Sequence, residues 1–252
     1  MYKIFLWGWV RMPKFFRAFI MSLVILAPFA ARADFGNLEA DTSDPLFILR
    51  DDAILSESGI EYGHDILRLS QAFRYGLNDR LSVNGRVHYQ IDFVDTHDGF
   101  SSIDIGSVYR MARAEDNNSR LISDVLFGFK FGGSKHVRSP EFADSSYYAG
   151  LRFGRKWAGV SLSATLKSTW VFDDKYGLSY IDFIPESYFR MDENWRSGLG
   201  FTFRKSTNFD YDQEWLNLKL ACQIGFTQWI GHIDYEFENE EAQVGLTVNV
   251  LF

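Results

Sequence analysis

The chain has few of the residues that fix a fold through covalent bonds or rigid turns. Its 252 residues include one cysteine, Cys222, and five prolines. A single cysteine excludes an internal disulfide framework. After residue 33 there is no apolar run of about 18 or more residues, which excludes a membrane-spanning helix there. An excess of basic residues is also missing, because the formal net charge is −7. Nucleic acid requires clustered positive charge, so we expect no nucleic-acid partner.

The first 33 residues have the organisation of a cleaved signal peptide. They are basic without acids, and an apolar core over residues 18–29 precedes an A-x-A cleavage signature at residues 31–33. This core is shorter than the about 20 residues that a membrane helix needs. We therefore expect export with cleavage before Asp34. A start at Met12 rather than Met1 would give a signal peptide of more ordinary length. Cleavage removes five cations and no anion, which changes the formal charge from −7 to −12.

From residue 53 onward, apolar and polar side chains alternate in segments of about 10 to 13 residues separated by turn signals, which is typical of antiparallel β-strands. The aromatic content of 17% suits strands whose outer face meets lipid. The alternation predicts twelve strands, over residues 53–62, 66–77, 81–93, 102–112, 120–132, 146–157, 159–172, 178–191, 195–206, 214–226, 229–238 and 242–252.

The alternation is most regular in the last eleven residues. Apolar residues from Val244 to Phe252 occupy one face of this strand, and polar residues from Gln243 to Asn249 occupy the other. A strand of this kind that ends in Phe252 resembles the closing strand of Gram-negative outer-membrane β-barrels. The resemblance implies that the barrel-insertion machinery recognises this strand, and that outer-membrane lipid and lipopolysaccharide surround the protein.

The expected fold is all-β: a transmembrane antiparallel up-and-down β-barrel of about 12 strands over residues 53–252. A cleaved signal peptide (1–33) and a periplasmic N-terminal segment (34–52) precede it. That segment is acidic and irregular, and two placements remain open, at the periplasmic mouth or partly inside the lumen. A soluble barrel or sandwich has the same alternation and is the main alternative.

Strand 81–93 indicates which face is wet. Its even-numbered side chains from Ser82 to Asp92 include Arg86 and His88, and its odd-numbered ones are mostly apolar. A set this charged would not form an ordinary core, because unpaired buried charges cost several kcal/mol each. We therefore expect lipid outside and a polar lumen. Turns after alternate strands are short, and Trp157, Trp195 and Trp229 lie beside them, which is typical of the periplasmic end. Both termini are thus expected in the periplasm.

The inward faces supply the candidate pore-lining residues: Arg68, Arg74, Arg86, His88, Asp92, Arg152, Lys167, Asp182 and Arg204. Laying neighbouring strands in register predicts four ion pairs: Arg110–Asp124, Asp104–Lys130, Asp182–Arg204 and Lys219–Glu236. Several inward cations have no evident partner in the sequence: Arg68, Arg74, Arg86, Arg152, Lys156, Arg190 and Arg196. One hypothesis is a locally positive lumen that favours anions. The alternative is that Asp92, Glu57 or Glu61 neutralises the Arg68/Arg86 cluster.

An enzymatic role is the less favoured hypothesis. Barrel enzymes that act on lipid carry a lipid-facing His and Ser, whereas here His64, His97 and His136 fall in loops and the remaining two face inward. A hydrolase or lipid-A-modifying enzyme at the lumen mouth would use His88 with Asp92, or His232 with Asp234. These spacings arise readily in a polar lumen, so we assign no catalytic residues, no metal ligands and no cofactor.

The function expected from the sequence is a narrow channel or transport component for small solutes. Arg68, Arg74, Arg86 and Arg152 are the residues expected to set its selectivity. A closed structural barrel for envelope integrity or partner binding is the alternative.

Overall fold

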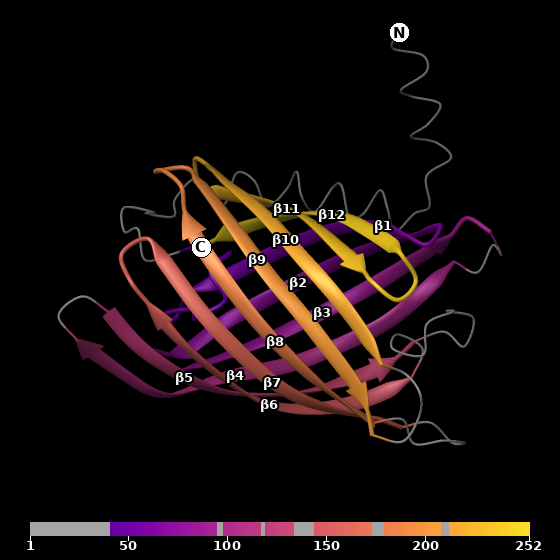
Figure 1. The fold of residues 1–252 in the computed structure, drawn as a ribbon, viewed down its shortest axis with the longest axis horizontal. Coiled ribbons are helices and arrows are strands. Elements are labelled where there is room, and N and C mark those ends of the chain that lie inside the picture. Colours follow the sequence, from indigo (N-terminus) through magenta and orange to yellow (C-terminus); the bar gives the residue numbers. More distant parts are fainter. Residues whose placement is uncertain (1–40, 95–97, 117–118, 134–143, 173–178, 208–211) are drawn as a thin grey trace, which may run out of the picture.

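The protein forms a closed barrel of twelve antiparallel strands (Figure 1). The computed structural model describes residues 41–94, 98–116, 119–133, 144–172, 179–207 and 212–252. The predicted signal peptide, together with His97 and His136, lies outside these described residues. The strands are β1 (Ile54–Gly63), β2 (Ile66–Asn78), β3 (Leu81–Asp92), β4 (Gly99–Asp116), β5 (Ser119–Gly132), β6 (Ser145–Lys156), β7 (Val160–Phe172), β8 (Ser179–Arg190), β9 (Trp195–Ser206), β10 (Gln213–Ile224), β11 (Thr227–Glu236) and β12 (Glu241–Leu251).

Every strand pairs with its neighbours in the sequence, and β1 closes the ring against β12. In that junction Leu55 lies opposite Leu251 and Tyr62 lies opposite Val244. The backbone of Phe252 adds two hydrogen bonds to Ile54, at 2.8 and 3.2 Å. An even number of strands in up-and-down order confirms the predicted fold class, and closure leaves no unpaired sheet edge.

Within the described residues, no helix has the length and apolar character needed to cross a membrane.

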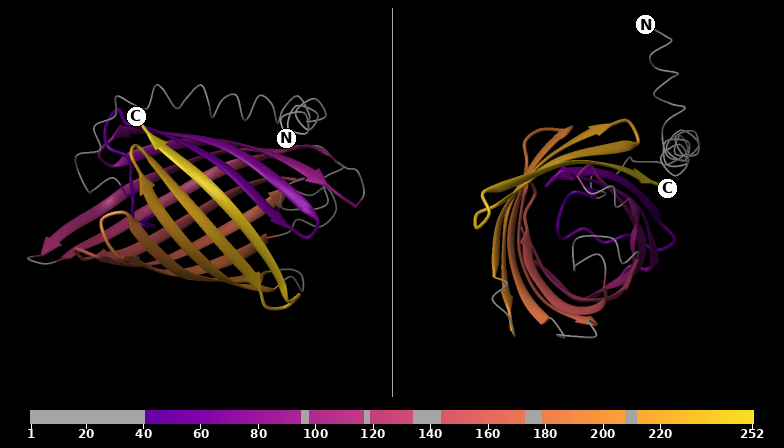
Figure 2. Two further views of the ribbon diagram at one scale, coloured as in Figure 1. Left: turned by 90° about the horizontal axis from the view of Figure 1, so that it is seen from above. Right: turned by 90° about the vertical axis from the view of Figure 1, so that its right-hand side faces the viewer.

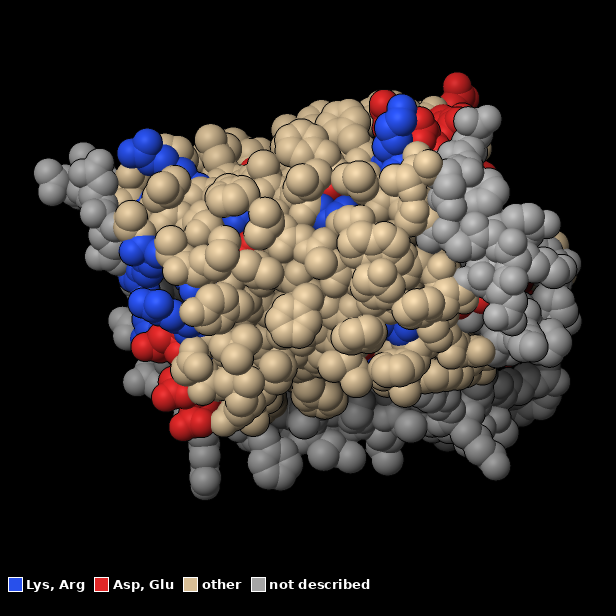
Figure 3. All heavy atoms as spheres, turned by 90° about the horizontal axis from the view of Figure 1, so that it is seen from below, with Lys and Arg blue, Asp and Glu red and all other residues tan. Residues whose placement is uncertain are grey.

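The wall of the barrel is apolar outside and polar inside. On β5, Phe127, Phe129 and Phe131 are 49, 52 and 52% exposed, whereas the inward Asp124 is fully buried. Figure 3 shows the result on one side of the molecule, where uncharged atoms form a broad band and charged side chains gather toward its two ends. A soluble barrel would show the reverse distribution. The arrangement is that of a barrel whose outer surface contacts lipid, as the sequence predicts.

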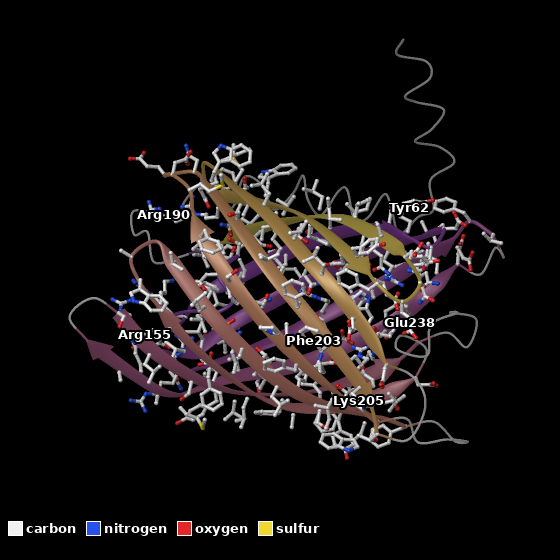
Figure 4. The ribbon with its side chains drawn as sticks, viewed as in Figure 1. Tyr62, Arg155, Arg190, Phe203, Lys205 and Glu238 are labelled. Carbon is white, nitrogen blue, oxygen red and sulfur yellow. The ribbon has the colours of Figure 1, made fainter. Side chains whose placement is uncertain are left out.

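The two ends of the barrel differ in their connections. Residues 79–80, 157–159, 191–194 and 225–226 connect strands at one end, where Ile54 and Phe252 also lie, and we call this the short-turn end. Most connections at the opposite, long-loop end are longer, such as 133–144 between β5 and β6. Figure 4 places Arg155 and Arg190 at the short-turn end and Tyr62, Lys205 and Glu238 at the long-loop end.

One predicted turn is wrong by two residues. The sequence places the turn between β10 and β11 near Gln228, whereas the structure places it at residues 225–226, where Gly225 has a φ of +60°. Glycine adopts this left-handed conformation without the steric cost of a Cβ. Moving the centre of a turn by two residues moves each cross-strand partner by four. Lys219 consequently lies opposite His232 and does not meet Glu236.

Candidate functional site

The N-terminal segment is described from residue 41 onward, and its residues 41–49 lie inside the barrel at the short-turn end. Figure 2 shows the indigo start of the described chain within the ring of strands. The Asp41 carboxylate accepts hydrogen bonds from Arg196 Nε at 2.8 Å, from Gln228 Nε2 at 2.8 Å and from the Tyr188 hydroxyl. Asp44 accepts from Lys156 Nζ at 2.5 Å and from Ser161 Oγ at 2.9 Å. Two acids thus fasten the segment to the inner wall.

The segment is also held by apolar burial. The side chains of Leu46 and Leu49 are only 2% exposed, which withdraws them almost completely from solvent. The carbonyl oxygen of Leu46 accepts a hydrogen bond of 2.7 Å from Arg110 of β4. The chain leaves the lumen past Gly76, where a Cβ would meet the carbonyl oxygen of Arg50 at 1.8 Å, so only glycine permits the crossing.

The contacts of Asp41 stabilise its charged form in this position. Burial by itself would raise the pKa of Asp41, since it disfavours the charged form. Hydrogen bonds from Tyr188, Gln228 and Ser43, together with the positive charge of Arg196, outweigh that effect and hold the pKa below its ordinary value. Asp41 therefore remains an anion that ties the segment to the wall.

Three carboxylates in the barrel wall are each held by two cations that lie on other strands, one or two strands away. Each group draws one residue from each of three consecutive strands, so the three groups divide β1 to β9 between them. The groups, which we call triads, are Arg74–Glu57–Arg86 on β1–β3, Arg110–Asp124–Arg152 on β4–β6 and Lys167–Asp182–Arg204 on β7–β9. With two cations and one anion, each triad carries a formal charge of +1.

The geometry of the triads is that of direct ion pairs. The nitrogen–oxygen distances are 2.8 and 3.3 Å around Glu57, 2.9 and 2.5 Å around Asp124, and 3.0 and 2.7 Å around Asp182. Asp124 and Asp182 lie opposite both of their cations in the strand register. In every triad the carboxylate side chain is less exposed than either of its cations. The acids are therefore recessed into the wall and the cations lie closer to the lumen.

A cavity of about 520 Å³ lies in the lumen beside the first triad. It is lined by Arg74 and Arg86, and by a second group in which Arg68 Nη1 meets Glu61 at 2.7 Å. Residues 42 and 43 of the N-terminal segment also line it. A second cavity, of about 420 Å³, lies at the short-turn end and is lined by residues 46–50 together with wall cations that include Lys156. The segment therefore borders both of these cavities.

The nine candidate pore-lining residues fall into three sets. Arg68, Arg74, Arg86 and His88 line the larger cavity. Arg152, Lys167, Asp182 and Arg204 belong to the other two triads. Asp92 is buried at the end of β3, where its carboxylate accepts the backbone N–H of Val94 at 2.9 Å.

Two of the predicted ion pairs are present as salt bridges, Arg110–Asp124 and Asp182–Arg204. Asp104 and Lys130 lie opposite one another in the register, as expected. The prediction for Lys219 is wrong, because the misplaced turn puts Glu236 out of reach; Lys219 Nζ instead meets Glu186 of β8 at 3.1 Å.

Most of the cations without an evident partner in the sequence have one in the structure. Glu57 and Glu61 hold Arg68, Arg74 and Arg86, which agrees with the alternative weighed against a simple positive lumen. Sequence reasoning missed that Lys156 and Arg196 bind the acids of the N-terminal segment. The signal for this was present, since an acidic segment precedes a barrel with surplus inward cations near its short-turn end.

The two inward histidines were each expected to pair with an acid on their own strand, His88 with Asp92 and His232 with Asp234, and the structure places the two differently. His88 Nε2 contacts Asp104 of β4 at 3.0 Å, and not Asp92. Residues four apart in a strand are separated by about 13 Å, at ~3.3 Å per residue, which is too far for side-chain contact. His232 Nε2 lies 3.8 Å from both Asp234 and Glu61.

Comparison with known proteins identifies the fold. No family model matches the chain, and no curated protein matches its sequence. Among solved structures, the KdgM porin superposes with a TM-score of 0.60 at 9% identity, covering 78% of this chain and 98% of that one. An outer-membrane channel from Pseudomonas putida F1 gives 0.62 at 12% identity, covering 82 and 98%. The NanC porin gives 0.57 at 9% identity, covering 78 and 98%. The chain thus has the fold of porin-like outer-membrane β-barrels.

Proposed function

We propose that the protein is a narrow outer-membrane channel for small acidic solutes, oriented with the short-turn end and both termini in the periplasm. The observation that carries this proposal is the set of three triads. Each places a recessed carboxylate behind two cations that lie nearer the lumen, so the inner surface presents positive charge although acids and bases are closely matched overall. Rings of cationic side chains favour anions in pores.

The larger cavity supplies a place where such a solute could bind during passage. Arg74 and Arg86 share the single carboxylate of Glu57, which leaves guanidinium N–H groups for a ligand carboxylate. We propose Arg68, Arg74, Arg86 and Arg152 as the residues that set selectivity.

Structures with the same fold support a channel role. KdgM, NanC and the Pseudomonas putida protein are porins or channels, and KdgM has also been solved in complex with disordered oligogalacturonate. For the present chain we propose the outer membrane as its location, lipopolysaccharide and lipid as its surroundings, and the strand ending at Phe252 as its signal for the insertion machinery.

The test is single-channel conductance of the refolded chain in a planar bilayer under a salt gradient. We expect discrete steps whose reversal potential indicates anion preference, and a weaker preference in Arg86→Ala. This substitution leaves the Arg74–Glu57 pair intact, so the barrel should still fold. Lys205→Ala is the matched control. It removes one positive charge, as Arg86→Ala does, but from a side chain that is 81% exposed at the long-loop end.

Each outcome decides between named alternatives. Cation preference, or an equal response to both substitutions, would contradict the role of the triads while keeping the channel. Silence from protein that has verifiably folded and inserted would contradict the channel. It would support the second candidate, a closed structural barrel. That candidate is favoured by the N-terminal segment, whose Asp41 and Asp44 are bound to the inner wall at the short-turn end.

A further inference from the structure

A histidine and two glutamates converge at the long-loop end of the barrel, away from the triads. His64 lies in the two-residue turn between β1 and β2, Glu236 ends β11 and Glu241 begins β12. One ligand atom from each residue lies within 4.8 Å of the other two. His64 Nδ1 and Glu241 Oε2 are in direct contact. The cluster joins the two turns that flank the β1–β12 junction.

The backbone fixes these three residues where they are. His64 and Asp65 have φ values of +53° and +60°, as the two central residues of a tight hairpin turn require, and this turn carries the imidazole toward β12. Glu236 and Glu241 lie directly opposite one another at the end of the β11–β12 hairpin. Like charges in this position destabilise a hairpin. An additional cation between them would remove that cost.

Among the described residues, no lysine or arginine side chain lies within ion-pair distance of either glutamate. Glu236 is nevertheless only 4% exposed. Its Oε1 accepts hydrogen bonds of 3.0 Å from both Gln213 Nε2 and Asn239 Nδ2. No described group donates to its Oε2. A buried carboxylate that amide donors orient, and that has an oxygen within 4.8 Å of a histidine nitrogen and a second carboxylate oxygen, is the arrangement of a metal ligand with outer-shell support.

We propose that His64, Glu236 and Glu241 bind a zinc ion that clamps the barrel junction at the long-loop end. One imidazole nitrogen and two carboxylate oxygens match the ligand types of zinc, with water in the fourth position. Calcium and magnesium prefer sites made of oxygen alone, and calcium takes six to eight ligands. A zinc ion here would tie the β1–β2 turn to the β11–β12 hairpin across the junction that closes the barrel.

The experiment is isothermal titration calorimetry of the folded full barrel with zinc chloride, repeated with magnesium and calcium chloride. We expect one zinc per chain and weak or no response to the other two ions. His64→Asn and Glu241→Gln should each weaken zinc binding at least about tenfold. Asparagine tolerates the left-handed backbone of residue 64, so His64→Asn should still fold. Glu238→Gln is the matched control, since it removes the same charge from the same hairpin without touching the cluster.

A second readout is thermal stability. Zinc should raise the melting temperature of the wild type and of Glu238→Gln, and should raise that of His64→Asn much less. Zinc binding that is equally strong in His64→Asn would overturn the proposal, as would tighter binding of calcium than of zinc. No binding by the wild type at millimolar zinc would overturn it as well.

Discussion

Within a triad, the cations and the carboxylate have unequal roles. Removing one cation leaves one ion pair, and the remaining charges still balance. Removing the carboxylate leaves two like charges side by side in a partly buried wall, which is the costly case for a buried pair. Asp182 is the clearest example, because it is fully buried and lies opposite both Lys167 and Arg204.

We therefore expect Asp182→Asn to destabilise the barrel by about 3 kcal/mol, and Arg86→Gln by ~1 kcal/mol or less. The measurement is the urea concentration at the midpoint of unfolding in lipid vesicles. Equal losses for the two variants would show that the carboxylates are no more important than the cations they hold.

A second expectation at this scale concerns acid. Because the pKa of Asp41 is lowered in the folded chain, its anchoring of the N-terminal segment is fully present above the ordinary value of 3.8 and is lost as the pH falls through the lower folded value. Limited proteolysis should therefore cut the segment faster at pH 3 than at pH 6. In Asp41→Asn the cutting rate should be high at both pH values. A wild-type rate that is the same at pH 3 and pH 6 would contradict this role.

At the scale of elements, alternation was enough to locate the strands. Most predicted boundaries lie within one or two residues of those in the structure, because a side-chain period of two is unambiguous in strands this long. The largest difference in bounds is at β4, which is predicted over residues 102–112 and observed over Gly99–Asp116. The error that changed a predicted ion pair is the turn after β10. A turn depends on one or two backbone angles, and Gly225 was not recognised as the residue that takes the left-handed one.

This turn yields a direct test. Gly225→Ala should destabilise the barrel by about 1 kcal/mol, because alanine at a φ of +60° is strained. A Cβ at residue 225 would meet no atom within 4 Å, so any loss comes from the backbone alone. Gly85→Ala is the control, since it is equally open and has no positive φ. Equal melting temperatures for the two variants would contradict the explanation.

The site was only partly predictable from the sequence. Pairs of facing strands could be laid in register, which gave Arg110–Asp124 and Asp182–Arg204. The third member of each triad, such as Arg152, depends on the next strand as well, and an error in either turn changes it. The charges of the acidic segment and of the inward cations indicate that the two could meet, but the particular partners of Asp41 and Asp44 could not be assigned, because no periodicity governs an irregular segment.

For the whole molecule, the decisive question is how far residues 41–49 obstruct the lumen. They border both cavities and bury two leucines against the short-turn end. Deleting residues 34–49 should raise the single-channel conductance, while residues 50–53 keep their hydrogen bonds to Gly76. Asp41→Asn with Asp44→Asn, which keeps the chain length, should raise the frequency of opening more than the size of each step. Unchanged conductance after the deletion would show that the segment does not limit flow.

The triads also constrain how this protein can change over generations. A lineage can lose one cation from a triad and keep a folded barrel with altered permeability, so solute preference is open to single substitutions. The carboxylate can be lost only after one or both of its cations. Diverging copies should therefore retain glutamate or aspartate at 57, 124 and 182 long after the surrounding arginines and lysines have been exchanged.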